Sequence, residues 1–301
     1  MNWSPSCNAC SETSSLSDGA NERGATFTER RLVIMSAPNG ARRLPSAEVG
    51  VPVTAGELAA CADALIEQSV AVLHMHVRDD NYRHTLDVDR YRDAMAAVRD
   101  RIGNSMIIQV TTEAVGIYHA EQQMSVVREL RPEAVSLALR ELCPDASAES
   151  AAGTFFEWLV AERIWPQYIL YSVDDLQRFD EFRRKGFFAE ERPFCMLVLG
   201  KYADGSEGQV EELAAMLNEV DCTQFPWAVC CFGRNENAAA LHADHAGGHI
   251  RLGFENNVML QDGDIAADNA ALVAQFHTSR QRPQRPAATA EEIRNEWLGA
   301  R

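Results

Sequence analysis

The sequence has no long hydrophobic run, since no stretch approaches the roughly 18 to 20 consecutive apolar residues that a membrane-spanning helix needs. The N-terminus also lacks the order of a secretory signal, in which a charged segment precedes an apolar one. These absences predict a cytoplasmic protein with no membrane partner.

Basic residues are also few. The chain of 301 residues has 28 Lys and Arg against 44 Asp and Glu, which gives a formal net charge of -16. A surface of this sign repels the phosphates of nucleic acids and of anionic membranes, so we expect no nucleic-acid partner. Local basic clusters such as Arg42-Arg43 can still hold a phosphate group.

A paired cysteine framework is missing, because the eight cysteines are scattered and most lie in apolar segments, where thiols pack as small hydrophobic side chains. Cys7-x-x-Cys10 has the spacing of a redox or zinc pair, but it lies in a polar leader without a second pair, so we do not expect it to bind metal. Residues 1–30 are rich in Ser, Asn, Thr, Gly and Glu, which predicts a disordered N-terminal extension. Residues 31–301 are predicted to form a single catalytic domain.

Short apolar runs alternate with amphipathic stretches from Leu32 onward. Strands are predicted at 32–36, 70–76, 106–110, 134–138, 166–170, 194–199, 227–231 and 249–252. Helices are predicted between them at 55–68, 87–101, 120–130, 154–163, 174–185, 209–219, 236–245 and 268–278. Several strand runs are continuously apolar, which is typical of parallel strands covered by helices.

Eight strands, each followed by a helix, predict an α/β fold of the (β/α)8 TIM-barrel type. The main alternative is an open doubly wound sheet. That fold usually has a Gly-rich phosphate turn after its first strand, and Pro38-Asn39-Gly40 is not such a turn.

Two histidines end the second predicted strand, in His74-Met75-His76. Side chains alternate along a strand, so both imidazoles point to one side and can bind one divalent metal ion. Arg251 and Glu255 lie at the end of the eighth strand, which flanks the first strand of a barrel as the second does. A site of two histidines and one glutamate leaves metal positions open for substrate, as catalytic sites do.

Other polar residues follow the predicted strands, at the end of a barrel where catalytic groups gather. They are Asn39, Arg42, Asp79, Thr111, Thr112, Glu113, Arg140, Glu141, Tyr171, Ser172, Lys201, Tyr202, Arg234 and Glu236.

Four motifs resemble one known family. They are Pro38-Asn39-Gly40-Ala41, His74-Met75-His76-Val77-Arg78-Asp79, Gln109-Val110-Thr111-Thr112 and the run from Gly247 to Asn257. In order and spacing they are similar to the β-keto acid cleavage enzymes, whose first characterised type is the 3-keto-5-aminohexanoate cleavage enzyme. The similarity runs from about residue 32 to residue 278.

The resemblance implies a zinc-dependent barrel that converts a β-keto acid and acetyl-CoA into acetoacetate and the CoA ester of the remaining acyl group. It places His74, His76 and Glu255 on the family's metal ligands and Arg251 on its active-site arginine. Thr111 falls on a serine that contacts the substrate, and Ser136 falls on another hydroxyl residue of the fourth strand. Asn39, Thr112 and Ser136 are expected to contact the substrate as well. The resemblance also suggests a homo-oligomer such as a tetramer.

Two positions depart from the characterised enzyme. Its aspartate after the metal-binding glutamate, which serves with the arginine as base, is Asn256 here, and an amide cannot accept a proton at neutral pH. Its glutamate that reads the substrate's amino group aligns with Arg42, which predicts a neutral or anionic substrate tail. The base is then one of Glu113, Glu141 and Asp79, and we favour Glu141.

Other functions remain open from the sequence. A metal-dependent hydrolase of the amidohydrolase type also has His-x-His in a barrel, but on the first strand and with further histidines after strands five and six. A class II aldolase would polarise a ketone with a metal, but it needs a phosphate-binding site that is not evident. The replacement of the aspartate by Asn256 is also compatible with a non-catalytic sensor of a keto acid or CoA ester.

Overall fold

The computed structural model describes residues 26–201, 205–280 and 285–299. Most of the predicted N-terminal extension, with Cys7 and Cys10, therefore lies outside the described residues. Its last residues form the short helix α1 (Phe27–Arg30), which begins at a capping box between Thr26 and Glu29.

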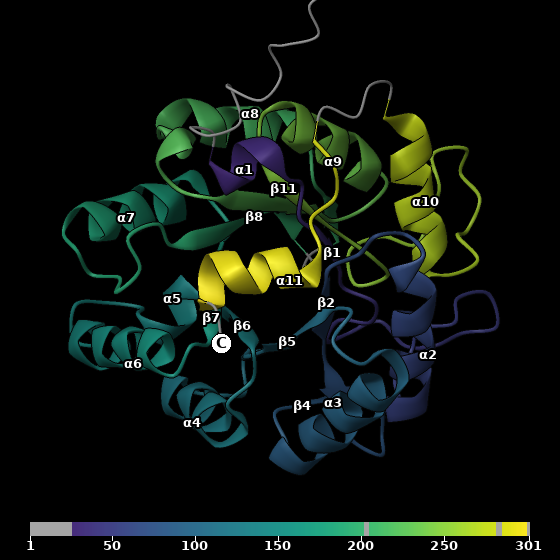
Figure 1. Ribbon diagram of the computed structural model, residues 1–301, viewed down its shortest axis with the longest axis horizontal. Helices are drawn as coiled ribbons and strands as arrows, with labels where there is room; N and C mark the ends of the chain where they lie inside the picture. The colour runs from purple at the N-terminus through teal and green to yellow at the C-terminus, as the bar shows by residue number, and fades with distance from the viewer. Residues whose placement is uncertain (1–25, 202–204, 281–284, 300–301) are drawn as a thin grey trace, which may run out of the picture.

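Eight parallel strands form a closed barrel, which confirms the predicted fold (Figure 1). The strands are β1 (Ile34–Ser36), β2 (Val72–Met75), β5 (Ile107–Thr111), β6 (Ala134–Ala138), β7 (Trp165–Leu170), β8 (Phe194–Lys201), β10 (Trp227–Cys231) and β11 (His249–Leu252). Each strand pairs in parallel with the next, β11 pairs with β1, and β10 pairs with β8, so the ring has no open edge. The eight segments are those expected from the apolar runs.

A helix follows each strand and covers the outside of the barrel (Figure 1). These helices are α2 (Ala55–Ile66), α3 (Val88–Ile102), α4 (Ala120–Leu130), α6 (Glu149–Ala161), α7 (Val173–Arg184), α8 (Val210–Glu219), α9 (Glu236–His245) and α10 (Asn269–Ser279). Their buried faces pack on the outward residues of the strands in one large apolar core. Within the described ranges, every helix is too short or too polar to span a bilayer.

Smaller elements lie at the two ends of the barrel. A hairpin of β3 (Val77–Arg78) and β4 (His84–Thr85) follows β2, α5 (Leu139–Leu142) follows β6, and β9 (Ser206–Glu207) pairs antiparallel with the end of β8. A 3-10 turn, η1 (Cys222–Gln224), precedes β10.

The C-terminal segment closes one end of the barrel. Helix α11 (Ala290–Ile293) and the π-helical turn η2 (Arg294–Leu298) lie across the ring in Figure 1. Trp297 stacks on Trp165, at the start of β7, with ring centroids 4.6 Å apart. Because this end is closed, the opposite end, where the strands finish, is the one open to ligands.

Candidate active site and metal centre

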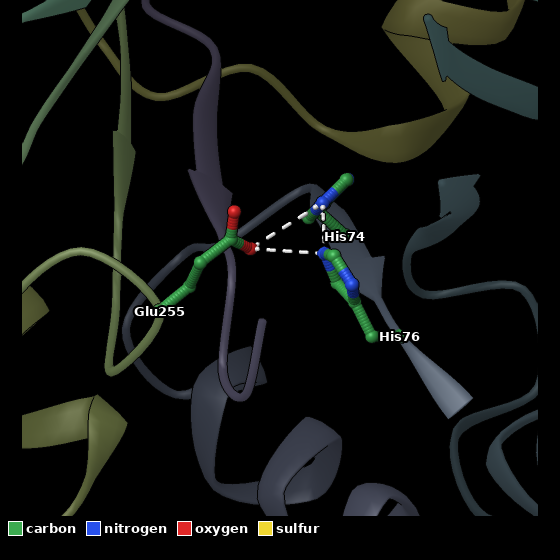
Figure 2. A group of neighbouring side chains, drawn as sticks. All are labelled: His74, His76 and Glu255. Atoms are coloured by element: carbon green, nitrogen blue, oxygen red, sulfur yellow. Dashed lines mark hydrogen bonds and ion pairs between the residues drawn. The ribbon is translucent and has the colours of Figure 1, made fainter. Parts of the chain in front are cut away.

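Three side chains predicted to bind metal converge at the finishing end of the strands (Figure 2). His74 lies on β2, His76 directly follows it, and Glu255 lies in the turn after β11. The Nε2 atoms of the two histidines are 3.1 Å apart, and Glu255 Oε2 is 3.4 Å from the first and 3.3 Å from the second. All three residues are buried.

Hydrogen bonds behind the imidazoles determine which ring nitrogen carries the proton. His74 Nδ1 is 2.8 Å from the acceptor Gln109 Oε1, so it is protonated and leaves a lone pair on Nε2. Burial lowers the pKa of His74 to about 3, which keeps its ring neutral at pH 7. His84 donates from Nε2 to the carbonyl oxygen of Glu113 at 3.0 Å. Its Nδ1 therefore accepts from His76 Nδ1, 3.4 Å away, and His76 Nε2 also keeps a lone pair.

Three lone pairs thus face one point without a proton between them. Glu255 Oε2 has no hydrogen-bond partner among the described residues. Such an arrangement is unfavourable unless the atoms share a cation. Their separations match the roughly 3.3 Å expected between ligands of a tetrahedral zinc ion with bonds of about 2.0 Å. The donor set therefore fits zinc or a similar divalent metal.

Two neighbours fix the Glu255 carboxylate. A Cβ at Gly40 would lie 2.5 Å from Glu255 Cγ, and Gly40 has a φ of +62°, so a glycine is required after β1. Arg251 on β11 donates from Nη2 to Glu255 Oε1 at 3.1 Å. Burial alone would raise the pKa of Glu255, but Arg251, His76 and His74 together outweigh it and hold that pKa below its usual range. Glu255 is therefore ionised at neutral pH.

Arg251 has two further contacts through the same nitrogen. Nη2 lies 3.2 Å from Cys230 Sγ and 3.1 Å from Asn256 Oδ1. Within the described part of the chain, Arg251 Nε has no hydrogen-bond partner. The guanidinium is 4% exposed, so it provides a strong local positive charge beside the three donor atoms.

A cavity of about 440 Å³ opens from this centre. The predicted residues that line it are Arg42, His74, Thr111, Glu113, Arg140, Glu141, Tyr171, Arg251 and Glu255. Ile169, Val198 and Phe232 add apolar surface. Arg140 lies over the ring of Tyr171, with its guanidinium carbon 3.7 Å from the centroid. A cavity with apolar walls and a few converging polar groups is suited to a small ligand.

The three base candidates lie in different surroundings. Glu113 and Glu141 both line the cavity, and burial raises the pKa of each. Glu141 also accepts the backbone N–H of Ala114 at 3.1 Å. Asp79 instead accepts backbone N–H groups within the β3–β4 hairpin and is not among the described residues that line the cavity. The geometry therefore favours the two glutamates as proton acceptors.

Comparisons with known proteins agree with the site's composition. Residues 31–298 match the family model described as beta-keto acid cleavage enzyme. The chain belongs to the β-keto acid cleavage enzyme family. This confirms the resemblance of the four motifs.

Individual members of the family align over most of their length. The chain is 26% identical over 269 residues to the 3-keto-5-aminohexanoate cleavage enzyme of Fusobacterium nucleatum, which covers 88% of this chain and 96% of that protein. It is 25% identical over 249 residues to the 3-oxoadipate:acetyl-CoA acetyltransferase of Cupriavidus necator, which covers 81% and 86%. The solved apo structure of ObcA shares the fold, with a TM-score of 0.65 and 13% identity over 83% of this chain and 66% of that one.

Of the five predicted substrate-binding residues, Thr111 and Arg42 line the cavity, but the other three do not. Asn39 donates to the carbonyl oxygen of His76 and accepts its N–H, so its amide holds the second histidine's backbone. Thr112 donates to the carbonyl oxygen of Ser136. The hydroxyl of Ser136 is buried without a partner among the described residues. None of these three is among the described residues that line the cavity.

The sequence reasoning missed two residues that support the metal centre. Gln109 belongs to a recognised motif, but its bond to His74 needed the strand register, in which His74 lies beside Gln109. His84 lies in the second strand of a hairpin whose strands have two residues each, which is too short to show a periodicity. A third histidine shortly after His-x-His was the available signal.

Proposed function

We propose that this chain is a zinc-dependent enzyme that converts a β-keto acid and acetyl-CoA into acetoacetate and the CoA ester of the remaining acyl group. The observation that carries the proposal is the convergence of three unprotonated donor atoms, from His74, His76 and Glu255, beside Arg251 in one cavity. When bound there, the metal would polarise a ketone as a Lewis acid. The family and the named relatives support the acetyl-CoA reaction.

Arg251 would hold the negative charge that develops on substrate oxygen. Its buried guanidinium is fixed by Glu255, Asn256 and Cys230 before substrate arrives, so little reorganisation is needed during the reaction. Arg251 is among the residues that line the cavity, so its charge lies beside a bound substrate.

Glu141 is our choice for the base that removes a proton from the β-keto acid at the carbon between its ketone and its carboxylate. That carbon can then bond to the acetyl carbonyl carbon and displace CoA thiolate, which takes the remaining acyl group as acetoacetate leaves. It lines the cavity, and burial raises its pKa toward the range in which a carboxylate is a more effective base at neutral pH. Glu113 is the rival in the same cavity. The backbone N–H of Ala114 holds Glu141 in place. Glu113 instead lies 3.8 Å from the Nδ1 atom of His76, where it interacts with a proposed metal ligand.

The substrate tail is proposed to be neutral or anionic. Arg42 and Arg140 both line the cavity and would attract a carboxylate. The relative named for 3-oxoadipate acts on a keto acid with a second carboxylate. An ammonium tail would meet two like charges.

The test is a panel of β-keto acids with anionic, neutral and cationic tails, assayed with the zinc-loaded protein, with and without acetyl-CoA, for consumption of the keto acid and for acetoacetate formation. We expect turnover that requires acetyl-CoA and favours anionic or neutral tails. Turnover without acetyl-CoA would indicate a hydrolase. Zinc and keto acid binding without product at high enzyme concentration would indicate a sensor, and preference for the aminated acid would contradict the role of Arg42.

We also propose that the protein is a homo-oligomer and that it is cytoplasmic. The family resemblance supports a homo-oligomer such as a tetramer, which light scattering of the purified protein would test. A cytoplasmic location is proposed from the sequence, and cell fractionation would test it.

A further inference from the structure

The amide of Asn256 is held from two sides. Its Oδ1 accepts from Arg251 Nη2 at 3.1 Å, while its Nδ2 donates to Glu236 Oε1 at 3.2 Å and to the carbonyl oxygen of Arg251 at 3.1 Å. A reversed amide would face a carboxylate with its oxygen and a guanidinium with its NH₂ group, so these neighbours fix its orientation. Asn256 thus joins the guanidinium of Arg251 to the carboxyl group of Glu236.

Glu236, the first residue of α9, is 2% exposed. Its carboxylate also accepts from the backbone N–H of Gly253 at 2.9 Å and from Asn257 Nδ2 at 3.4 Å. Burial raises the pKa of Glu236 to about 8, while the hydrogen bonds from Gly253, Asn256 and Asn257 act in the opposite direction. All three partners are donors, so they stabilise the ionised carboxylate against the effect of burial.

A buried carboxylate needs a compensating cation, and the chain of contacts leads to Arg251. Glu236 itself is not among the described residues that line the cavity, so it can affect the reaction only indirectly, through its hydrogen bond with Asn256. The arrangement resembles a guanidinium and carboxylate pair with one amide placed between the two charges.

We propose that Glu236 is a positioning residue: through Asn256 it holds the guanidinium of Arg251 in place, and in its ionised form it places a negative charge one side chain away from the position that an aspartate at 256 would occupy. The inference rests on the proposed function, because Arg251 has its role in that reaction.

The test compares Glu236→Gln in two backgrounds of the zinc-loaded enzyme. In the wild-type background we expect kcat to fall on the order of ten- to a hundredfold, with KM for acetyl-CoA changed by less than about twofold. In an Asn256→Asp background, two carboxylates would compete for one buried site, so Glu236→Gln is expected to leave kcat unchanged or raise it. An equal loss of kcat in both backgrounds would overturn the proposal.

Asn257→Ala is the matched control, because it removes a donor from the other carboxylate oxygen and leaves Asn256 in place. It is expected to lower the melting temperature as Glu236→Gln does, but to keep kcat within about threefold of wild type. Equal losses of kcat in the two variants would show a merely structural role and overturn the proposal.

If Glu236→Gln fails to fold, Asn256→Leu tests the same link with Glu236 intact. It must lower kcat as steeply, and a folded Asn256→Leu protein with wild-type kcat would overturn the proposal. If wild type has no turnover, the proposed function fails by itself. Calorimetry of keto acid binding without acetyl-CoA then tests the link, with about tenfold weaker binding expected for Glu236→Gln and equal affinities contradicting it.

Discussion

At the scale of single residues, the candidate active site is characterised by the protonation state in which each side chain is held. His74 is held neutral by burial, the hydrogen bonds of both histidines direct a lone pair on Nε2 toward Glu255, and Glu255 itself is held ionised. Glu113 and Glu141 have the opposite bias, since burial raises the pKa of both. The same cavity therefore combines an acid that stays charged with acids that are able to exchange protons.

Replacing Glu141 by glutamine is expected to lower kcat by about a hundredfold or more, since a positioned base contributes on the order of 10² to 10⁴. A base must be ionised, so wild-type kcat/KM should fall as pH drops through the pKa of Glu141. Burial raises that pKa, so this limb should lie above the range of an ordinary glutamate. Steady-state kinetics across pH checks both effects.

Asp79→Asn is the matched control for this experiment, because Asp79 serves the β3–β4 hairpin through backbone contacts that an asparagine oxygen can keep. It should leave kcat close to wild type. If Glu141→Gln keeps both turnover and the acidic limb while Glu113→Gln loses them, the base is Glu113.

At the scale of elements, the β3–β4 hairpin supports the metal centre from outside the barrel. It is antiparallel, pairs Arg78 with His84, and brings the His84 ring within 3.4 Å of His76. Arg78 donates to the carbonyl oxygens of Gly40 and Tyr82, so it ties the loop after β1 to the hairpin. The element therefore fixes a proposed metal ligand, His76, without contributing one.

His84→Phe should weaken zinc binding on the order of ten- to a hundredfold, because His76 loses the acceptor that fixes its tautomer. Titration of the metal-free protein against a chelator of known affinity measures this effect. Tyr82→Asn is a control in the same hairpin, since Tyr82 is 50% exposed and asparagine tolerates its φ of +58°. Unchanged zinc affinity in His84→Phe would show that the hairpin does not support the ligand.

The main elements were predictable because each barrel strand is an apolar run and the helices between them are amphipathic. The convergence of the two histidines was also predictable, since the parity of His-x-His places both rings on one side of β2. Asn39 and Thr112 show what could not be predicted from the sequence. They share motifs with residues of the cavity, but their side chains bond to the backbone of neighbouring strands. Such contacts depend on register, which the sequence pattern does not contain.

At the scale of the whole molecule, the metal centre is expected to link the stability of the barrel to zinc. The three donors come from β2 and from the turn after β11, which flank β1 on either side. Zinc at a hundred times its Kd would stabilise the folded state by about 2.7 kcal/mol, which corresponds to a rise in melting temperature of roughly 4–5 °C for a chain of this size. Calorimetric melts with and without zinc measure the rise.

Variants of two buried strand histidines distinguish the zinc-dependent rise in melting temperature from a general loss of stability. His74→Gln should abolish most of the zinc-dependent rise, because it removes one of three donors. His249 accepts the backbone N–H of Val33 at 3.0 Å and stacks on Phe194, away from the donor group. His249→Gln should therefore lower the melting temperature yet keep the full rise. A full rise in His74→Gln would mean that zinc stabilises the protein from a different site, and the assignment of the metal ligands would be wrong.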